Sequence, residues 1–149
     1  MKSMIKYSVQ LVKEKEEKYM EKQANSPEAV ANIINEVFNM DTQPFETFVM
    51  MALDTKKRPV GCFVVSQGSL NGTIVEPREV FQRAILVNAD SIVVAHNHPS
   101  GEVIPSFKDM DATRVLKEAG ELLRIELVDH IIIGENGKYY SFRENGQVF

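Results

Sequence analysis

Apolar residues along the chain follow two spacings, one typical of helices and the other of strands. In residues 26–39 they recur every three or four positions, and the preceding pair Ser26–Pro27 favours the start of a helix. Segments beginning at Pro77 and at Ser106 carry the same spacing. We therefore predict three helices, and the apolar residues expected inward in the last two are Val80, Phe81, Ala84 and Ile85, then Val115, Leu116, Ala119, Leu122 and Leu123.

Short apolar runs bounded by polar turns predict the strands. Runs at 45–53 and 60–66 should form a hairpin across the turn 54–59, and a loop should follow at 67–72. Three further strands are expected at 91–96, 127–133 and 139–142. Alternating hairpin and strand–helix–strand units predict an α/β fold, with a mixed β-sheet sandwiched by helices.

The pattern is weaker in residues 1–25, which we treat as an N-terminal extension of a domain spanning 26–149. Residues 7–12 alternate loosely and could form an edge strand. The charged segment that follows could be a loop or a helix.

Composition narrows the class of protein. A chain of 149 residues with 44% hydrophobic and 26% charged residues is typical of a single globular domain. It contains neither an apolar run of about 20 residues nor a signal-peptide pattern, so we expect a cytoplasmic protein without a membrane span. The net charge of −4 gives no whole-chain indication of nucleic-acid binding. The single cysteine, Cys62, excludes an internal disulfide and a zinc site with several thiolates, and its apolar neighbours favour a core residue over a nucleophile.

The candidate chemistry lies directly after the strand expected at 91–96. Alternate residues of an extended chain point to the same side, so His96 and His98 should project side by side. Asp109 follows in the first turn of the third predicted helix. Two imidazoles and one carboxylate, with one position left for water, are typical of catalytic zinc. The sequence therefore predicts a metal-dependent hydrolase.

Other polar residues near this set have two interpretations each. Ser106 and Asp109 form the Ser-x-x-Asp pattern of a capping box, and Ser106 could also present its hydroxyl to a substrate oxygen. His130 could be a hydrogen-bonded core residue or a residue behind the site, and we do not assign it as a ligand. Glu46 could carry the proton that hydrolysis must move, and the alternatives for that role are Glu76, Glu79 and Glu102.

The arrangement of these residues resembles the JAMM motif of JAB/MPN-domain metalloproteases: His-x-His, seven residues, Ser-x-x-Asp, and a Glu upstream. The string His-Asn-His-Pro-Ser-Gly at 96–101, with the segments 53–56, 77–80 and 129–134, resembles specifically the RadC family over residues 26–142. The resemblance implies one zinc ion with a bound water on His96, His98 and Asp109. It further implies Glu46 as general acid/base, Ser106 as an oxyanion-assisting residue, and the cytidine-deaminase-like fold of JAB/MPN domains.

The function that this resemblance implies is a zinc-dependent hydrolase of peptide or isopeptide bonds, with a peptide or protein substrate and a nominal link to DNA repair. Longer RadC proteins carry a helix-hairpin-helix region, which we do not expect within these 149 residues. Glu76 also stands where many relatives have His, so we assign it no role. The alternative is a non-catalytic accessory module of DNA repair or mobile elements, with nucleic acid as its partner by family association.

Rival enzyme classes share parts of the ligand set. A zinc deaminase needs further cysteine ligands, which Cys62 alone does not supply. An Fe(II) oxygenase uses two histidines and a carboxylate, so the ligand types alone leave that alternative open.

Overall fold

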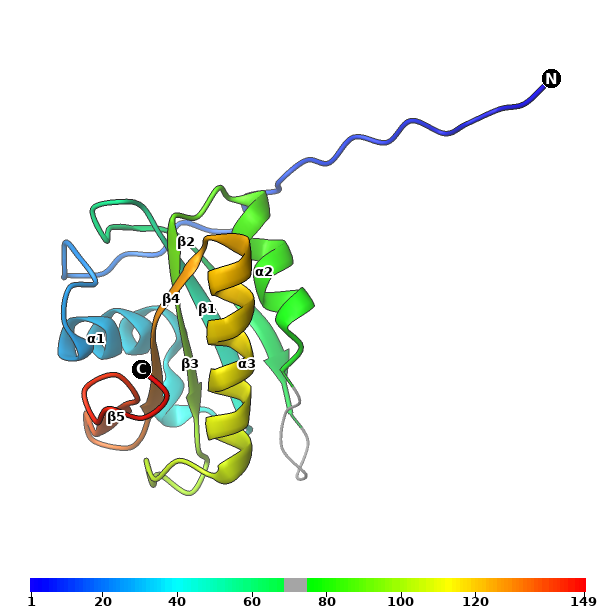
Figure 1. Ribbon diagram of the computed structural model, residues 1–149. Helices are drawn as coiled ribbons and strands as arrows, with labels where there is room; N and C mark the ends of the chain where they lie inside the picture. The colour runs from blue at the N-terminus through cyan, green and yellow to red at the C-terminus, as the bar shows by residue number, and fades with distance from the viewer. Residues whose placement is uncertain (69–74) are drawn as a thin grey trace.

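The computed structural model describes residues 1–68 and 75–149 (Figure 1). Across these residues one sheet is formed, with the strand order β2-β1-β3-β4-β5. Its strands are β1 (Thr47–Leu53), β2 (Pro59–Gln67), β3 (Ser91–Asn97), β4 (Glu126–Ile133) and β5 (Tyr139–Ser141). β3 and β4 run parallel, and every other neighbouring pair is antiparallel. The predicted mixed sheet is confirmed.

Helices cover both faces of this sheet. α1 (Pro27–Phe38), followed by the short 3-10 helix η1 (Met40–Thr42), packs on one face. α2 (Pro77–Leu86) and α3 (Phe107–Leu123) pack on the other (Figure 1). The predicted sandwich of helices around a mixed sheet is therefore also confirmed.

The two central strands set the direction in which the site residues point. Every residue of β1 and β3 is buried, as expected for strands covered on both faces. Val93 and Ala95 belong to the core on the α1 side, whereas Ile92 and Val94 belong to the core beneath α2 and α3. Because successive side chains alternate, His96 lies on the α2–α3 side of the sheet.

The inward faces of α2 and α3 are narrower than predicted. Leu116 is fully buried and Ala119 packs on the core, but Val115, Leu122 and Leu123 are exposed, as is Ile85 in α2. Thr113 and Gly120 are buried in α3 instead. A side chain at Gly120 would collide with the backbone oxygen of Ile125, so α3 approaches the start of β4 closely at this point.

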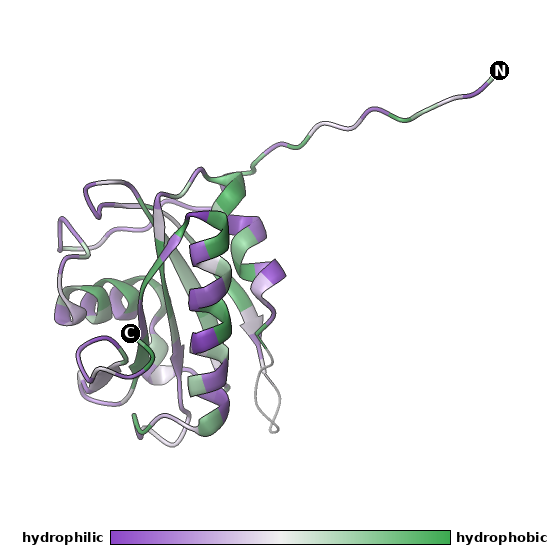
Figure 2. Cartoon of the chain, in the orientation of Figure 1, coloured by the Kyte–Doolittle hydropathy of each residue, from purple (hydrophilic) through white to green (hydrophobic). Residues whose placement is uncertain are grey.

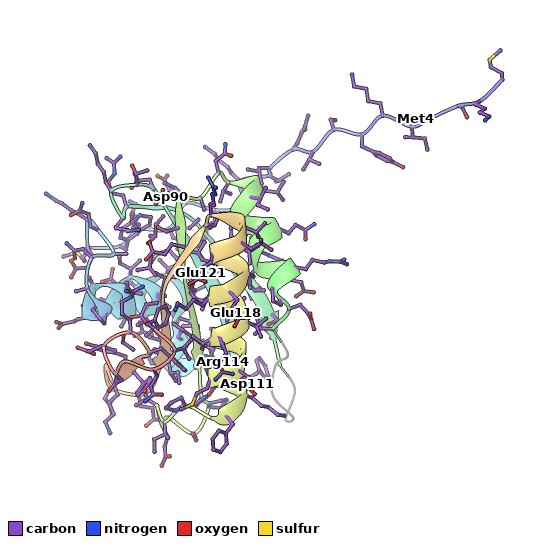
Figure 3. All side chains as sticks on the ribbon, in the orientation of Figure 1. Met4, Asp90, Asp111, Arg114, Glu118 and Glu121 are labelled. Atoms are coloured by element: carbon purple, nitrogen blue, oxygen red, sulfur yellow. The ribbon has the colours of Figure 1, made fainter. Side chains whose placement is uncertain are left out.

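The exposed part of α3 carries both hydrophilic and hydrophobic residues, which alternate along the helix in Figure 2. Asp111, Arg114, Glu118 and Glu121 lie along this helix (Figure 3), and all of them are exposed. Arg114 forms an ion pair with Asp111 at 2.8 Å.

The edge strand considered for residues 7–12 in the N-terminal extension is not formed. Residues 7–12 form no strand and are exposed along their whole length, because they pair with neither edge of the sheet. The chain joins the domain near Ala24, whose N–H donates to the carbonyl oxygen of Lys57 at 2.8 Å.

Most of the loop predicted at 67–72 falls in 69–74, outside the described residues. Among the helices that the structure describes, none combines the length and the apolar character that crossing a bilayer requires.

Candidate metal centre

Four side chains from three separate parts of the chain converge at one end of the sheet. Glu46, His96, His98 and Asp109 each offer one ligand atom, and these atoms all lie within 4.8 Å of one another. Glu46 directly precedes β1, His96 is in β3, His98 follows the end of β3, and Asp109 is in the first turn of α3. The antiparallel register of β1 and β3 pairs Phe48 with His96 and so brings the start of β1 beside the end of β3.

The structure therefore brings together all the residues that the sequence suggested for metal binding, and Glu46 with them. Within the described part of the chain, the group that could hold a metal ion includes none of the alternative carboxylates. Those alternatives were Glu76, Glu79 and Glu102.

The distances within the group fit a single small cation. His96 Nε2 lies 3.0 Å from His98 Nε2, and Asp109 oxygens lie 3.2 Å from each of these nitrogens. A tetrahedral ion with ligand bonds of about 2.0–2.1 Å holds its ligand atoms about 3.3–3.4 Å apart. Glu46 Oε1 is farther away, at 3.9 Å from His96 Nε2. His96, His98 and Asp109 thus have the spacing of ligands to one ion, with Glu46 beside them.

The group is buried at one side and open at the other. The side chain of His96 is 1% exposed, that of Asp109 12%, that of His98 20% and that of Glu46 23%. The His96 ring also stacks on Phe48, with ring centroids 6.0 Å apart. A ligand from solvent therefore reaches the site on the side of His98 and Glu46.

Asp109 is held as a carboxylate by its surroundings. Burial opposes its ionisation, but the neighbouring imidazoles of His96 and His98 outweigh burial and hold the pKa of the Asp109 carboxyl well below its usual value. The hydrogen bond with Asp109 in turn raises the pKa of His98. An anionic Asp109 supplies the negative charge that a divalent cation requires.

Ser106 caps α3 as the sequence predicted. Its hydroxyl oxygen accepts from the N–H of Asp109 at 3.1 Å, and its own N–H donates to Asp109 Oδ2 at 2.8 Å. This reciprocal pair is the capping box. The same bond fixes the Asp109 carboxylate toward the two imidazoles, so the cap also orients the site.

The ring of His98 is oriented by the loop that follows it. Gly101 has a φ of 82°, and its N–H donates to the His98 carbonyl oxygen at 2.8 Å. The resulting turn places the carbonyl oxygen of Glu102 3.0 Å from His98 Nδ1. Because a carbonyl only accepts, His98 Nδ1 carries a hydrogen, and in the neutral ring that binds a metal ion Nε2 presents a lone pair to the site.

Asn97 is a site residue that the sequence interpretation missed. Its side chain points away from the two neighbouring imidazoles and is buried. Asn97 Oδ1 accepts from the N–H of Thr47 at 2.7 Å, and Nδ2 donates to the carbonyl oxygen of Phe45 at 3.0 Å. These two bonds hold the backbone on either side of Glu46. The signal was available, since a buried amide at the end of a strand has to find hydrogen-bond partners.

His130 is a buried, hydrogen-bonded residue that also lies directly behind His96. It is 1% exposed, and its Nε2 lies 2.7 Å from His96 Nδ1. Burial lowers the pKa of His130 well below its usual value. The parallel register pairs Val94 with His130, which puts His130 on the same face of the sheet as His96. The two interpretations of His130 as core residue and as neighbour of the site therefore both apply.

Comparison with known proteins shows the family to which this chain belongs. A family model described as the RadC-like JAB domain matches residues 24–147. The chain belongs to the RadC-like JAB family. The family resemblance expected from the sequence is confirmed.

This RadC-like chain is similar to UPF0758 proteins of several organisms. A UPF0758 protein of Desulfitobacterium hafniense is 43% identical over 122 residues, which is 82% of this chain and 52% of that protein. A UPF0758 protein of Pelobacter propionicus is 50% identical over 101 residues, covering 68% of this chain and 44% of the relative. One of Methanosarcina acetivorans is 48% identical over 109 residues, covering 73% and 47%. The chain thus spans about half the length of these relatives, whose names state no activity.

Proposed function

We propose that this RadC-like JAB domain is a zinc-dependent hydrolase that cleaves amide bonds of peptides or isopeptide links. The observation that carries the proposal is the group itself. His96 Nε2 and His98 Nε2 lie 3.0 Å apart, each lies 3.2 Å from one oxygen of the Asp109 carboxylate, and the carboxylate of Glu46 lies beside this group. Such an arrangement leaves a coordination position for solvent and a nearby base to act on it.

Zinc suits the donor set. Two neutral imidazole nitrogens and one carboxylate form a three-residue ligand group of the kind found in catalytic zinc sites, and the chain's single cysteine plays no part in it. When bound, the ion acts as a Lewis acid and lowers the pKa of a coordinated water toward about 7. His96, His98 and Asp109 would hold it.

Glu46 is the residue that we assign to proton transfer. Its side chain is 23% exposed, so both the group and an incoming substrate are within its reach. In the proposed reaction Glu46 takes a proton from the attacking water as the new C–O bond forms. It then delivers that proton to the amine nitrogen as the C–N bond breaks. The proton, the water oxygen and the leaving amine are all accounted for without another reactant.

Ser106 is the second residue that we assign to the reaction. It is exposed at the start of α3, and its oxygen accepts from the N–H of Asp109, which leaves the hydroxyl hydrogen to donate. We propose that this hydroxyl donates to the substrate carbonyl oxygen as negative charge develops there.

The test compares purified zinc-loaded wild type with the near-isosteric variant Glu46→Gln. Each protein is incubated with a proteome-derived peptide library and with an isopeptide-linked lysine substrate, and new amino termini are identified by mass spectrometry. Glu102→Gln is the matched control, because this exposed glutamate lies near the site but outside the group. We expect Glu46→Gln to cleave about 10²–10⁴-fold more slowly than wild type while its zinc content stays unchanged. Glu102→Gln should cleave at the wild-type rate.

Two results would contradict the proposal. One is cleavage by Glu46→Gln at the wild-type rate, which would remove Glu46 from proton transfer. The other is zinc-loaded wild type that cleaves no more than Glu46→Gln, which would favour a non-catalytic binding module of the same fold.

A further inference from the structure

A chain of short contacts runs from the metal group into the core and back to the same group. His96 Nδ1 lies 2.7 Å from His130 Nε2, and His130 Nδ1 lies 2.6 Å from the hydroxyl oxygen of Thr113. That hydroxyl also lies 2.6 Å from the carbonyl oxygen of Asp109. His96, His130 and Thr113 are each no more than 1% exposed, so these contacts are shielded from solvent.

The position of the hydrogen in each of these contacts can be assigned, starting from the carbonyl oxygen of Asp109. The carbonyl oxygen of Asp109 can only accept, so the single hydroxyl hydrogen of Thr113 points to it. The Thr113 oxygen then has no hydrogen to offer to His130. It must accept, and the hydrogen in that contact belongs to His130 Nδ1.

The remaining nitrogen of His130 follows from its surroundings. The His130 ring is stacked on Phe142 with centroids 4.7 Å apart, and it meets Phe48 in a T-shaped contact with centroids 5.6 Å apart. A second ring hydrogen would place a buried cation between these aromatic rings, which is costly without an ionic partner. His130 Nε2 therefore presents a lone pair, and the hydrogen between the two histidines belongs to His96 Nδ1.

We infer that Thr113 and His130 are positioning residues, which fix His96 as the tautomer whose Nε2 lone pair faces the metal ion. This inference rests on the metal site of the proposed function. Both residues are buried, so neither contacts substrate, and they act on the metal site through His96. The series of hydrogen bonds starts at the backbone carbonyl of Asp109 and ends at His96, so it also connects the metal-binding residue on α3 to the one on β3. Residues that orient a metal-binding histidine in this way typically change metal affinity about 10–100-fold.

The first experiment reads the hydrogens directly. Wild-type protein labelled with ¹⁵N and loaded with zinc chloride is studied by long-range proton–nitrogen correlation and by scalar coupling across hydrogen bonds. We expect His130 to be protonated at Nδ1 alone, with a nitrogen–nitrogen coupling between His130 Nε2 and His96 Nδ1. A hydrogen on His130 Nε2 would overturn the inference.

The second experiment measures how much the hydrogen bond between Thr113 and His130 contributes to zinc affinity. Thr113→Val removes the acceptor for His130 Nδ1 while keeping the shape of the side chain, and Thr113→Ser keeps the hydroxyl. In chelator competition we expect Thr113→Val to bind zinc about 10–100-fold more weakly than wild type, and Thr113→Ser to restore most of the loss. Thr113→Val should also show His130 as a mixture of tautomers, which a loss of packing alone would not produce. Equal zinc affinity in Thr113→Val and wild type would overturn the inference.

The outcomes separate this inference from the proposed function. If Thr113→Val does not fold, the wild-type spectrum still decides, because it needs no variant. Zinc binding with the expected tautomer but without peptide cleavage would reject only the hydrolase. Zinc binding with a hydrogen on His130 Nε2 would reject only the positioning chain, and a wild type that binds no zinc would reject both.

Discussion

Asn97 offers a sharp test of how Glu46 is held, because its side chain bonds the backbone on both sides of that residue. We consider Asn97→Leu, which keeps nearly the same side-chain shape but removes the amide. The change leaves the zinc ligands in place, since Asn97 points to the opposite side of β3 from His96.

The magnitude follows from the bonds that are lost. The N–H of Thr47 is buried and loses its acceptor at 2.7 Å, and a buried donor left without a partner costs about 1–3 kcal/mol. The carbonyl oxygen of Phe45 loses a donor at 3.0 Å, but Phe45 is exposed, so water can replace much of that bond at a net cost of about 1 kcal/mol. Together these losses predict a free energy of unfolding lower by about 3 kcal/mol, which for a domain of this size lowers the melting temperature by about 6–12 °C.

The assay is equilibrium urea unfolding of metal-free protein, with Asn32→Leu as the matched control. Asn32 lies on the exposed side of α1, so the same substitution there should change stability by less than about 0.5 kcal/mol. The zinc-loaded variant should keep one zinc ion but cleave peptides about 10-fold or more slowly, because Glu46 no longer has a fixed position. Unfolding of Asn97→Leu at the wild-type urea concentration would refute the reasoning, since the two bonds would then hold nothing.

Two further predictions use other parts of the chain. Ser106→Ala and Ser26→Ala each remove a helix cap whose hydroxyl accepts a backbone N–H at 3.1 Å, so each should lower the free energy of unfolding by about 1 kcal/mol. Only Ser106→Ala should also slow peptide cleavage. Equal cleavage rates of the two variants would limit the role of Ser106 to helix capping. Burial and the nearby Glu17 raise the pKa of the Cys62 thiol, so iodoacetamide should modify Cys62 more slowly than free cysteine at pH 7 and faster as the pH rises. Mass spectrometry measures that rate, and modification of the half-buried Cys62 as fast as that of free cysteine would contradict the raised pKa of its thiol.

The sequence predicted the parts of the site that depend on local spacing. His96 and His98 are two residues apart at the end of a buried strand, and Asp109 lies in a capping box that the residues themselves display. Those patterns need no knowledge of the tertiary fold. The order of apolar runs likewise predicted a mixed sheet with helices on both faces.

The remaining parts depend on contacts between segments far apart in the chain. Glu46 reaches the group only through the pairing of β1 with β3, and no local pattern distinguished it from the other glutamates. His130 reaches His96 through the parallel register of β3 and β4. The inward face of α3 was predicted too wide, because helical spacing alone does not show how closely Gly120 approaches β4.

Metal analysis of the purified protein decides whether His96, His98 and Asp109 hold one zinc ion. Wild type and His98→Ala are prepared side by side, exchanged into the same zinc-containing buffer, desalted, and analysed for zinc per chain by mass spectrometry. We expect one zinc ion per wild-type chain and a large loss of zinc in His98→Ala. Equal zinc in the two proteins would show that His98 is not a ligand and that the proposed site does not hold the ion.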